Sequence, residues 1–222
     1  MFHFLEKNPF FFAVFLFIVI AFAGLIEILP GFAQASRPLV DTKPYTMLEL
    51  AGKNIYIQEN CLSCHSQLIR PFKSETDRYG MYSLSGEYAY HRPFLWGSKR
   101  TGPDLHRVGN YRTTDWHENH MKDPHAIVPG SIMPPYPWLF EKNADLDTAY
   151  AEAVTVQTVF DTPYNQPGMP VTGAGVEEAR KIMIEEAKAI VDGMKDPGVK
   201  AAYENGEVRE IVALIAYLNR QK

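Results

Sequence analysis

Residues 61–65 read Cys61-Leu62-Ser63-Cys64-His65 and contain both cysteines of the 222-residue chain. Two thiols three positions apart can each form a thioether with a vinyl group of haem, and the histidine that follows can bind the iron from the same side. This spacing is the signature of covalent c-type haem attachment. It predicts one haem c, held by Cys61 and Cys64, with His65 as the proximal axial ligand.

Two other kinds of site use paired cysteines. A thioredoxin-like redox pair needs a βαβ setting, which the surrounding sequence does not predict, and it gives His65 no role. A structural zinc site needs four ligands, and no third cysteine exists to complete one or to build a disulfide framework. Haem attachment therefore explains the pentapeptide better than either alternative.

An apolar segment precedes this motif. From Phe10 to Ile26 every residue is apolar or glycine, and residues 27–31, Glu-Ile-Leu-Pro-Gly, are expected to end the run. About twenty residues at a rise of about 1.5 Å span a hydrocarbon core of about 30 Å, so residues 1–31 are predicted to form a transmembrane anchor. The alternative is a signal peptide cleaved near Ala33-Gln34-Ala35, but the run exceeds the roughly 7–15 apolar residues of a signal-peptide core.

The orientation of this anchor follows from the haem motif. The flanking charges are too balanced to decide it, with Lys7 on one side and Arg37 and Lys43 on the other. Because c-type haem is attached on the outer face of the bacterial inner membrane, we expect a cytoplasmic N-terminus and a periplasmic haem domain. Near the outer end of the helix, the Glu27 carboxylate is expected either to reach the lipid headgroups or to contact a neighbouring subunit.

The rest of the chain predicts helices joined by loops. Residues 32–45 are expected to be a linker, since Pro38 and Pro44 discourage helix, and residues 46–222 to form one haem domain. Segment 66–100 is rich in aromatic residues without a clean period, so we expect an ordered loop that contacts other subunits or covers the haem. Periodicity and capping signals predict helices over residues 46–59, 113–122, 143–160, 176–194 and 207–220. The fold class is therefore all-α, with no alternating pattern that predicts a strand.

The sixth iron ligand is expected from one of two proline-rich loops. Met133 lies in Pro129-Gly130-Ser131-Ile132-Met133-Pro134-Pro135, and Met169 lies in the similar Gln166-Pro167-Gly168-Met169-Pro170. Prolines restrict the backbone and can hold a weak thioether ligand in place. A methionine ligand also gives a higher potential than a second histidine. The sequence favours Met133, with Met169 and the histidines as alternatives.

Residues 102–105, Gly-Pro-Asp-Leu, are the other segment with an expected role at the haem. The Pro103 carbonyl can accept the Nδ1–H of His65, which fixes the tautomer of the ligand, and Leu105 would pack on the haem face. Alone, Gly-Pro-Asp is ordinary turn chemistry. His117 and His120 have metal-ligand spacing on a predicted helix, but no third ligand follows in a recognisable pattern.

Taken together, these blocks resemble the membrane-anchored monohaem cytochrome c subunit (subunit II) of cbb3-type cytochrome c oxidases, which are haem-copper oxidases. The resemblance covers essentially the full length, although residues 143–206 match least distinctively. Isolated class I cytochromes share the haem motif and the Gly-Pro-Asp-Leu type of turn, but not the longer blocks. Those blocks are residues 27–30, 56–71, 96–105 and 129–139.

The resemblance implies a class I cytochrome c fold with insertions, packed on a catalytic haem-copper subunit, and it assigns the distal iron ligand to Met133. It implies a non-catalytic subunit that takes electrons from a dihaem cytochrome c subunit or a soluble cytochrome c. Those electrons would pass to the subunit that reduces oxygen to water. The alternatives are a stand-alone membrane-tethered cytochrome c, or the haem c subunit of another respiratory complex such as nitric oxide reductase. With a net charge of −4 and no long basic run, the chain gives no sign of nucleic-acid binding.

Overall fold

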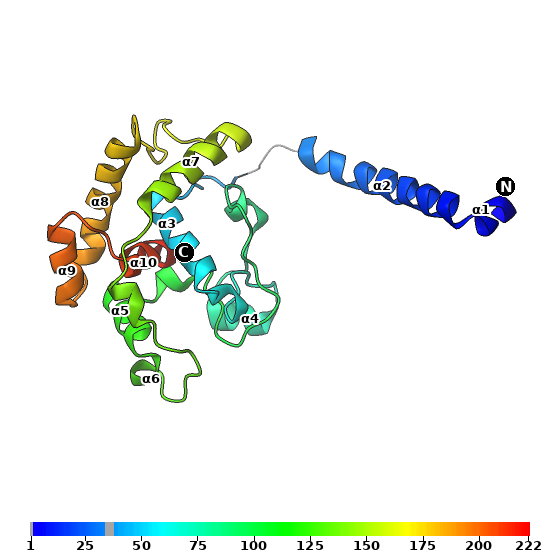
Figure 1. Ribbon diagram of the computed structural model, residues 1–222. Helices are drawn as coiled ribbons and strands as arrows, with labels where there is room; N and C mark the ends of the chain where they lie inside the picture. The colour runs from blue at the N-terminus through cyan, green and yellow to red at the C-terminus, as the bar shows by residue number, and fades with distance from the viewer. Residues whose placement is uncertain (1, 34–37) are drawn as a thin grey trace. The chain divides into compact units, whose positions relative to one another are not determined.

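The computed structural model describes residues 2–33 and 38–222, and it divides the chain into two units, residues 1–37 and 38–222. The N-terminal unit contains the short helix α1, Phe2–Lys7, and the long helix α2, Pro9–Ala33 (Figure 1). Within α2, Pro9–Gly31 is long and apolar enough to cross a membrane. This confirms the prediction of one N-terminal candidate membrane helix.

Helix α2 contains Pro30 and continues two residues past the expected end of the anchor at residue 31, to Ala33. Proline lacks the N–H that would donate to the carbonyl four residues earlier, but near the end of an apolar helix the loss of that one bond is tolerated. Gln34-Ala35 of the alternative cleavage site lies outside the described residues. So do residues 34–37 of the expected linker, including Arg37.

Two crossing helices form the centre of the second unit. Helix α3, Met47–Gln58, packs against the C-terminal helix α10, Glu210–Arg220 (Figure 1). Their backbones approach closely at Gly52, where an added Cβ would lie 1.9 Å from the Ala213 carbonyl oxygen. The large side chains buried between them and their neighbours include Leu48, Ile55, Ile211, Leu214 and Ile215, each of which stabilises the fold by about 1.5–3 kcal/mol.

A local signal sets the start of α3. Thr46 accepts a hydrogen bond from the Glu49 backbone N–H through its hydroxyl, and the Glu49 carboxylate accepts the Thr46 backbone N–H. This capping box satisfies two of the backbone donors that every helix start leaves unpaired. The predicted start at residue 46 is therefore confirmed, because Thr46 is the N-cap residue of α3.

The remaining helices surround this pair. Helices α7, Leu146–Phe160, and α8, Val176–Asp192, pack against α3, and α9, Pro197–Glu204, packs against α8. Helix α5, Thr114–Lys122, lies against α10 and continues into α6, Pro124–Ile127. In the residues that the structure describes there is no strand, only an isolated bridge between Asn143 and Arg209. The all-α class is confirmed.

Three details of these helices differ from expectation. The last helix begins at Glu210 rather than residue 207, because the Glu210 N–H donates to the Lys142 carbonyl in a contact outside the helix. Helices α6 and α9 were not predicted. Each begins with an aspartate cap followed by proline at the first helical position, a signal that the sequence carries at Asp123-Pro124 and Asp196-Pro197.

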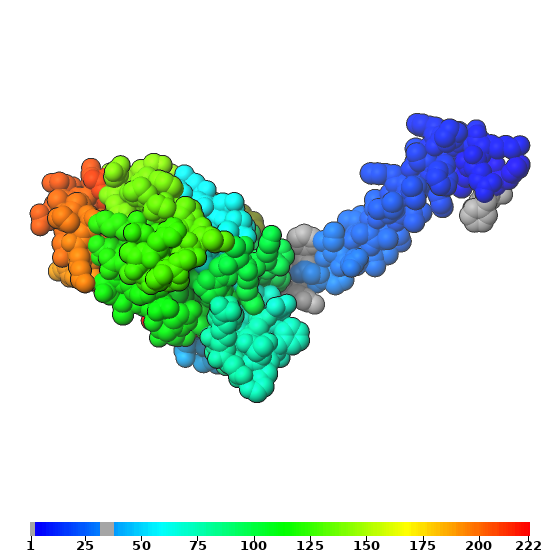
Figure 2. Space-filling model, turned by 90° about the horizontal axis from the view of Figure 1, so that it is seen from below, coloured from blue at the N-terminus to red at the C-terminus, as the bar shows by residue number. Residues whose placement is uncertain are grey.

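Segment 66–100 is mostly loop, as expected, with the short helix α4, Lys73–Tyr79, and the 3₁₀ turn η2, Ser85–Tyr88. The space-filling view shows the region around α4, in teal, as a bulge on the surface of the second unit (Figure 2). Tyr88 is buried, but Phe94 and Trp96 are exposed and stack face to face with ring centroids 4.7 Å apart. The segment thus has both a buried side and an exposed aromatic one.

Candidate haem site

A tight turn after α3 carries the cysteine motif. Asn60 adopts a left-handed backbone conformation with φ of 57°, and the 3₁₀ turn η1, Cys61–Ser63, follows it. The backbone N–H groups of Cys64 and His65 both donate to the Cys61 carbonyl, over 3.2 and 2.9 Å. One turn therefore carries both thiols and the imidazole.

The two thiols differ in environment. Cys61 is half-buried and packs against the apolar core, whereas Cys64 is exposed, and neither is in a disulfide. Burial raises the pKa of the Cys61 thiol to about 12, so it is a neutral thiol at physiological pH. Within residues 2–33 and 38–222, no three His, Cys, Asp or Glu side chains gather closely enough to hold a metal ion. The pair is thus placed as two separate thiols rather than as part of a thiolate metal cluster.

His65 lies beside the segment that the sequence pairs with it. Its Nδ1 is 2.8 Å from the Pro103 carbonyl oxygen, which can only accept, so Nδ1 carries the proton. Nε2 is then left with a free lone pair, as an iron ligand requires. Burial lowers the pKa of His65, and the Pro103 carbonyl partly offsets this effect. The ring is therefore held neutral and in one tautomer.

Gly102 leaves room for this ring. A Cβ atom at position 102 would lie 2.3 Å from Cε1 and 2.8 Å from Nδ1 of His65, closer than van der Waals contact allows. The backbone N–H groups of Thr101 and Gly102 both donate to the Cys64 carbonyl, each over 2.9 Å. Because the backbone is fixed on both sides, an added methyl group would displace the ring itself and break its bond to the Pro103 carbonyl.

Gly102→Ala is therefore expected to displace the His65 imidazole. We expect the variant to show a mixture of iron ligation states and a lower thermal midpoint, measured by the absorption spectrum and by circular dichroism of the haem-loaded chain. Gly175→Ala is the control for the glycine substitution itself, since an added Cβ there meets nothing within 4 Å and the backbone is extended, with φ of −179°. A wild-type spectrum for Gly102→Ala would contradict the placement of His65.

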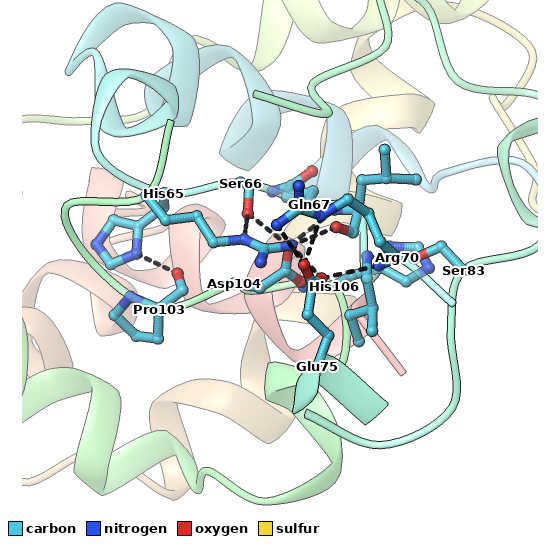
Figure 3. Close-up of polar contacts among 12 residues, drawn as sticks. His65, Ser66, Gln67, Arg70, Glu75, Ser83, Pro103, Asp104 and His106 are labelled. Atoms are coloured by element: carbon cyan, nitrogen blue, oxygen red, sulfur yellow. Dashed lines mark hydrogen bonds and ion pairs between the residues drawn. The ribbon is translucent and has the colours of Figure 1, made fainter. Parts of the chain in front are cut away.

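A set of polar side chains, most of them buried, ties this segment to the residues after the haem motif (Figure 3). We call Ser66, Arg70, Glu75, Arg100 and Asp104 the polar brace. The Asp104 carboxylate accepts hydrogen bonds from the Ser66 hydroxyl at 2.6 Å, from the Leu68 N–H at 2.9 Å and from the His106 N–H at 2.8 Å. These bonds fix Asp104, which follows Pro103, to Ser66, which follows His65.

Arg100 connects the brace to helix α4. Its guanidinium donates to the Glu75 carboxylate over 2.8 Å, to the Leu68 carbonyl over 2.6 Å and to the Ser66 hydroxyl. The other side of Glu75 pairs with Arg70. The hydrogen bond from Arg100 is the main cause that lowers the pKa of Glu75 from 4.5 to about 2. The brace is thus a charged network whose members are all satisfied, the condition under which buried charge is tolerated.

The low pKa of Glu75 makes stability depend on pH. A carboxylate with a depressed folded-state pKa contributes stability that is present above its unfolded value of 4.5 and is lost as the pH falls toward 2. Glu75→Gln is expected to be destabilised by on the order of 3 kcal/mol at pH 7, because it removes the carboxylate that Arg100 and Arg70 share and leaves Arg100 only the more distant Asp104 at 3.4 Å. It should also lose much of the acid sensitivity, measured as thermal midpoints between pH 3 and pH 7.

A surface pair provides the matched control. Asp77 pairs with Lys73 on the same helix, and its side chain is 62% exposed, so Asp77→Asn should change stability by less than about 1 kcal/mol. Equal pH profiles for Glu75→Gln and the wild type would show that the brace does not contribute the acid-sensitive stability.

The Met133 loop lies near the cysteine turn. Tyr136, three residues after Met133, donates its N–H to the Met121 carbonyl on α5 over 2.9 Å. Burial raises the pKa of the Tyr136 phenol, and the nearby Cys61 and Cys64 add to this effect. Met133 itself is half-buried against the same core that Cys61 contacts.

Met169 has a different setting. It lies between α7 and α8 in a loop closed by its own backbone bonds, with the Met169 N–H donating to Gln166 over 3.0 Å and the Asn165 N–H to Pro170 over 3.0 Å. It is not among the residues that pack on the core beside the cysteine turn. The geometry therefore favours Met133 over Met169 as the residue facing the haem motif.

The donor set and its surroundings fit a haem. Two free thiols and a neutral, oriented imidazole lie on one turn, and the half-buried apolar residues near them come from three separate segments. A flat apolar group bound there would cover surface that the protein leaves half exposed. Those half-buried residues are Cys61, Leu62, Leu105, Met133 and Tyr136.

Sequence reasoning missed the brace and Gly102. Arg100 and Asp104 lie inside a recognised block, but their partners Ser66 and Glu75 are 34 and 25 residues from Arg100 in sequence, and no local pattern links them. The buried position of His117 was also missed. It is 2% exposed, whereas the sequence indicated only a helical pair with His120.

Comparison with known proteins gives one family for the chain. The family model described as cytochrome c oxidase, mono-heme subunit/FixO matches residues 2–221. No match was found among curated proteins. The family match confirms the resemblance to the monohaem subunit of cbb3-type oxidases. The chain belongs to the FixO family of monohaem cytochrome c oxidase subunits.

Proposed function

We propose that this subunit is the electron relay of its oxidase, with one haem c attached through thioethers to Cys61 and Cys64. His65 and Met133 are the axial ligands in this proposal. The observation that carries it is the single turn that presents both thiols beside an imidazole whose Nδ1 is 2.8 Å from the Pro103 carbonyl. Such a turn suits a redox group that must be held without any change of position.

Each residue has a defined part in this function. Bound haem supplies the one-electron chemistry, and the protein sets its position and potential. Cys61 and Cys64 fix the haem to the turn, while the Pro103 carbonyl keeps the Nε2 atom of His65 free for the iron. A thioether ligand from Met133 stabilises the reduced state relative to a second histidine, which suits an acceptor for electrons from another cytochrome.

The membrane arrangement follows from the anchor and the attachment chemistry. We propose that α2 spans the bacterial inner membrane once, with the N-terminus in the cytoplasm and the haem unit in the periplasm. The donor is a dihaem cytochrome c subunit of the complex or a soluble cytochrome c. The acceptor is the catalytic haem-copper subunit, which carries the oxygen chemistry, so this chain is a non-catalytic part of the enzyme.

Purification of the intact complex from detergent-solubilised membranes tests this proposal. We expect the catalytic subunit to co-purify with the tagged chain, identified by mass spectrometry. Complexes without this chain should lose oxygen consumption driven by reduced cytochrome c but keep it with a small reductant that reaches the catalytic subunit directly. Isolation as a free monohaem protein would instead support a stand-alone tethered cytochrome, and a nitric oxide reductase partner would support the other alternative.

A further inference from the structure

The C-terminal part of segment 66–100 carries a pair of stacked aromatic rings at the surface. Phe94 is 48% exposed and Trp96 is 40% exposed, and their ring planes lie within 8° of parallel with centroids 4.7 Å apart. Both rings make T-shaped contacts with the buried Tyr88, over centroid distances of 6.3 and 5.7 Å. The core therefore holds the pair in place while its outer side meets solvent, as for the aromatic residues at the centre of protein interfaces.

Positive charge accompanies these rings. The Arg92 guanidinium lies 5.9 Å from the centroid of the Phe94 ring, and Lys99 ends a run of exposed residues, 96–99, that begins with Trp96. Among the described residues, neither Arg92 nor Lys99 forms an ion pair with a carboxylate. We call Arg92, Phe94, Trp96 and Lys99 the docking patch. It combines an apolar pair of rings with a free cation on each side of them in sequence.

Segment 66–100 also differs in charge from the rest of the protein. It contains six lysines and arginines but only three aspartates and glutamates, a formal charge of +3, whereas the whole chain carries −4, so the other residues together carry −7. A partner with an acidic surface would therefore be attracted to this segment and repelled by the remainder of the chain. Charge complementarity thus indicates an acidic partner.

The size of the docking patch indicates that this partner binds transiently. Permanent subunit interfaces bury roughly 2,000 Å² or more and are strongly apolar, whereas the patch offers two exposed rings and two cations. Electron-transfer encounters lie at the small end of protein interfaces, below about 1,200 Å², and opposite charges raise their association rates. The patch therefore suits a mobile electron donor better than a permanent subunit.

The backbone of the docking patch contacts the residues that follow the haem motif. The Trp96 carbonyl accepts the Gln67 N–H over 3.0 Å. A Cβ atom added at Gly97 would lie 3.1 Å from the Ser66 Cα and 3.4 Å from the His65 carbonyl oxygen. One hydrogen bond and two residues of chain thus connect Trp96 to the proposed proximal ligand, so a donor seated on the patch would lie against the segment that carries His65.

We propose that the docking patch binds a soluble electron donor, a cytochrome c whose own contact surface has an apolar centre and an acidic rim. The inference rests on the proposed function, because it needs a haem on this chain to accept the electron. The step moves one electron and no atoms: the ferrous donor is oxidised and the haem of this chain is reduced. Phe94 and Trp96 supply the contact from which water is excluded, and Arg92 and Lys99 steer the encounter.

Stopped-flow reduction of the haem-loaded oxidase complex tests the docking patch, with a reduced, acidic soluble cytochrome c as the probe. The second-order rate constant should fall as ionic strength rises, because salt screens opposite charges. Trp96→Ala should lower this rate constant by roughly tenfold. Lys99→Glu should lower it at low salt and match the wild type at high salt. Both variants should also bind the oxidised probe more weakly when the complex is immobilised, while the reduction potential and reduction by a small chemical reductant stay unchanged.

Each of these variants has a matched control. Phe72 is 56% exposed and lies 5.5 Å from the Arg70 guanidinium, so Phe72→Ala removes another exposed ring that an arginine covers from the same segment. Lys181 is exposed on α8, so Lys181→Glu makes the same charge reversal on another element. Both controls should keep the wild-type rate constant at every salt concentration.

Three results would overturn the inference. The first is a wild-type rate constant in Trp96→Ala and Lys99→Glu, or an equal loss in their controls. The second is faster reduction by a basic soluble cytochrome c than by the acidic one. The third is loss of a dihaem cytochrome c subunit from the purified Trp96→Ala complex, which would make the patch a permanent interface. Lys99→Glu leaves both rings in place and decides the question if Trp96→Ala does not accumulate.

Failure of the proposed function is distinguishable from failure of this inference. A wild-type complex in which this chain carries no covalent haem by mass spectrometry would contradict the proposed function. A loaded complex that the acidic probe reduces at a rate unaffected by salt, Trp96→Ala or Lys99→Glu would contradict only the assignment of the docking patch.

Discussion

Cys64→Ser is expected to reduce covalently bound haem to background, with the protein migrating as an unstained band after denaturing electrophoresis and haem staining. Serine cannot form the thioether, and c-type attachment uses both thiols of the motif, so a chain that keeps only the Cys61 thiol is not expected to be loaded with haem. Cys61→Ser should give the same loss. It also removes a half-buried sulfur that packs against the core, so the chain itself should be less stable.

A control for this effect lies between the two cysteines. Ser63 is exposed, and its hydroxyl is within reach of the Asn60 carbonyl at 2.9 Å and of Cys64 Sγ at 3.8 Å, so Ser63→Ala keeps both thiols and removes only these surface bonds. It should load haem as the wild type does. Full haem loading of either cysteine variant, with intact electron transfer, would contradict the attachment that we propose.

Met133→Ala is expected to keep the covalent haem and to lose methionine ligation. The ferric protein should lose the charge-transfer band in the red that methionine ligation gives. Axial ligands set haem potentials over a range of about 0.8 V, so we expect the potential to fall by on the order of 0.2 V. A redox titration followed by absorption measures this fall. Electron transfer from a cytochrome c donor should slow in parallel, because the acceptor becomes the weaker oxidant.

Met169→Ala separates the two candidate ligands. Because Met169 lies in a separate loop that is closed by its own backbone bonds, its replacement should leave the band and the potential unchanged. If Met169→Ala lost the band and Met133→Ala kept it, the distal ligand would be Met169 instead.

Local signals explain which parts of this molecule were predictable. Three features were predicted from continuous stretches of sequence: the capping box at Thr46, the apolar run of α2, and the spacing of Cys61, Cys64 and His65. Each depends on residues that are neighbours in the chain, so it can be recognised without knowing the tertiary contacts. The all-α class followed from the same kind of evidence.

Long-range contacts explain what was missed. Glu75 and Arg100 have the composition of a solvated surface, and only the folded chain shows that they pair in a buried position. The burial of His117 was missed for a similar reason, because a histidine on a polar helix gives no sign that its ring is buried. The two residues by which α2 exceeds the predicted anchor have a different cause. The rule that proline ends a helix is weaker near the end of an apolar helix than in the middle of a soluble one.

The polar brace has a mechanical consequence for the segment that it closes. Ser66 and Arg100, the two ends of segment 66–100, are hydrogen-bonded to each other and to Asp104, so the segment leaves and rejoins the haem unit at one fixed point. A partner that docks on the exposed Phe94–Trp96 stack would load this closed loop at its ends, where the ion pairs resist it. Such a load would have to break these hydrogen bonds and ion pairs before it displaced the backbone at His65.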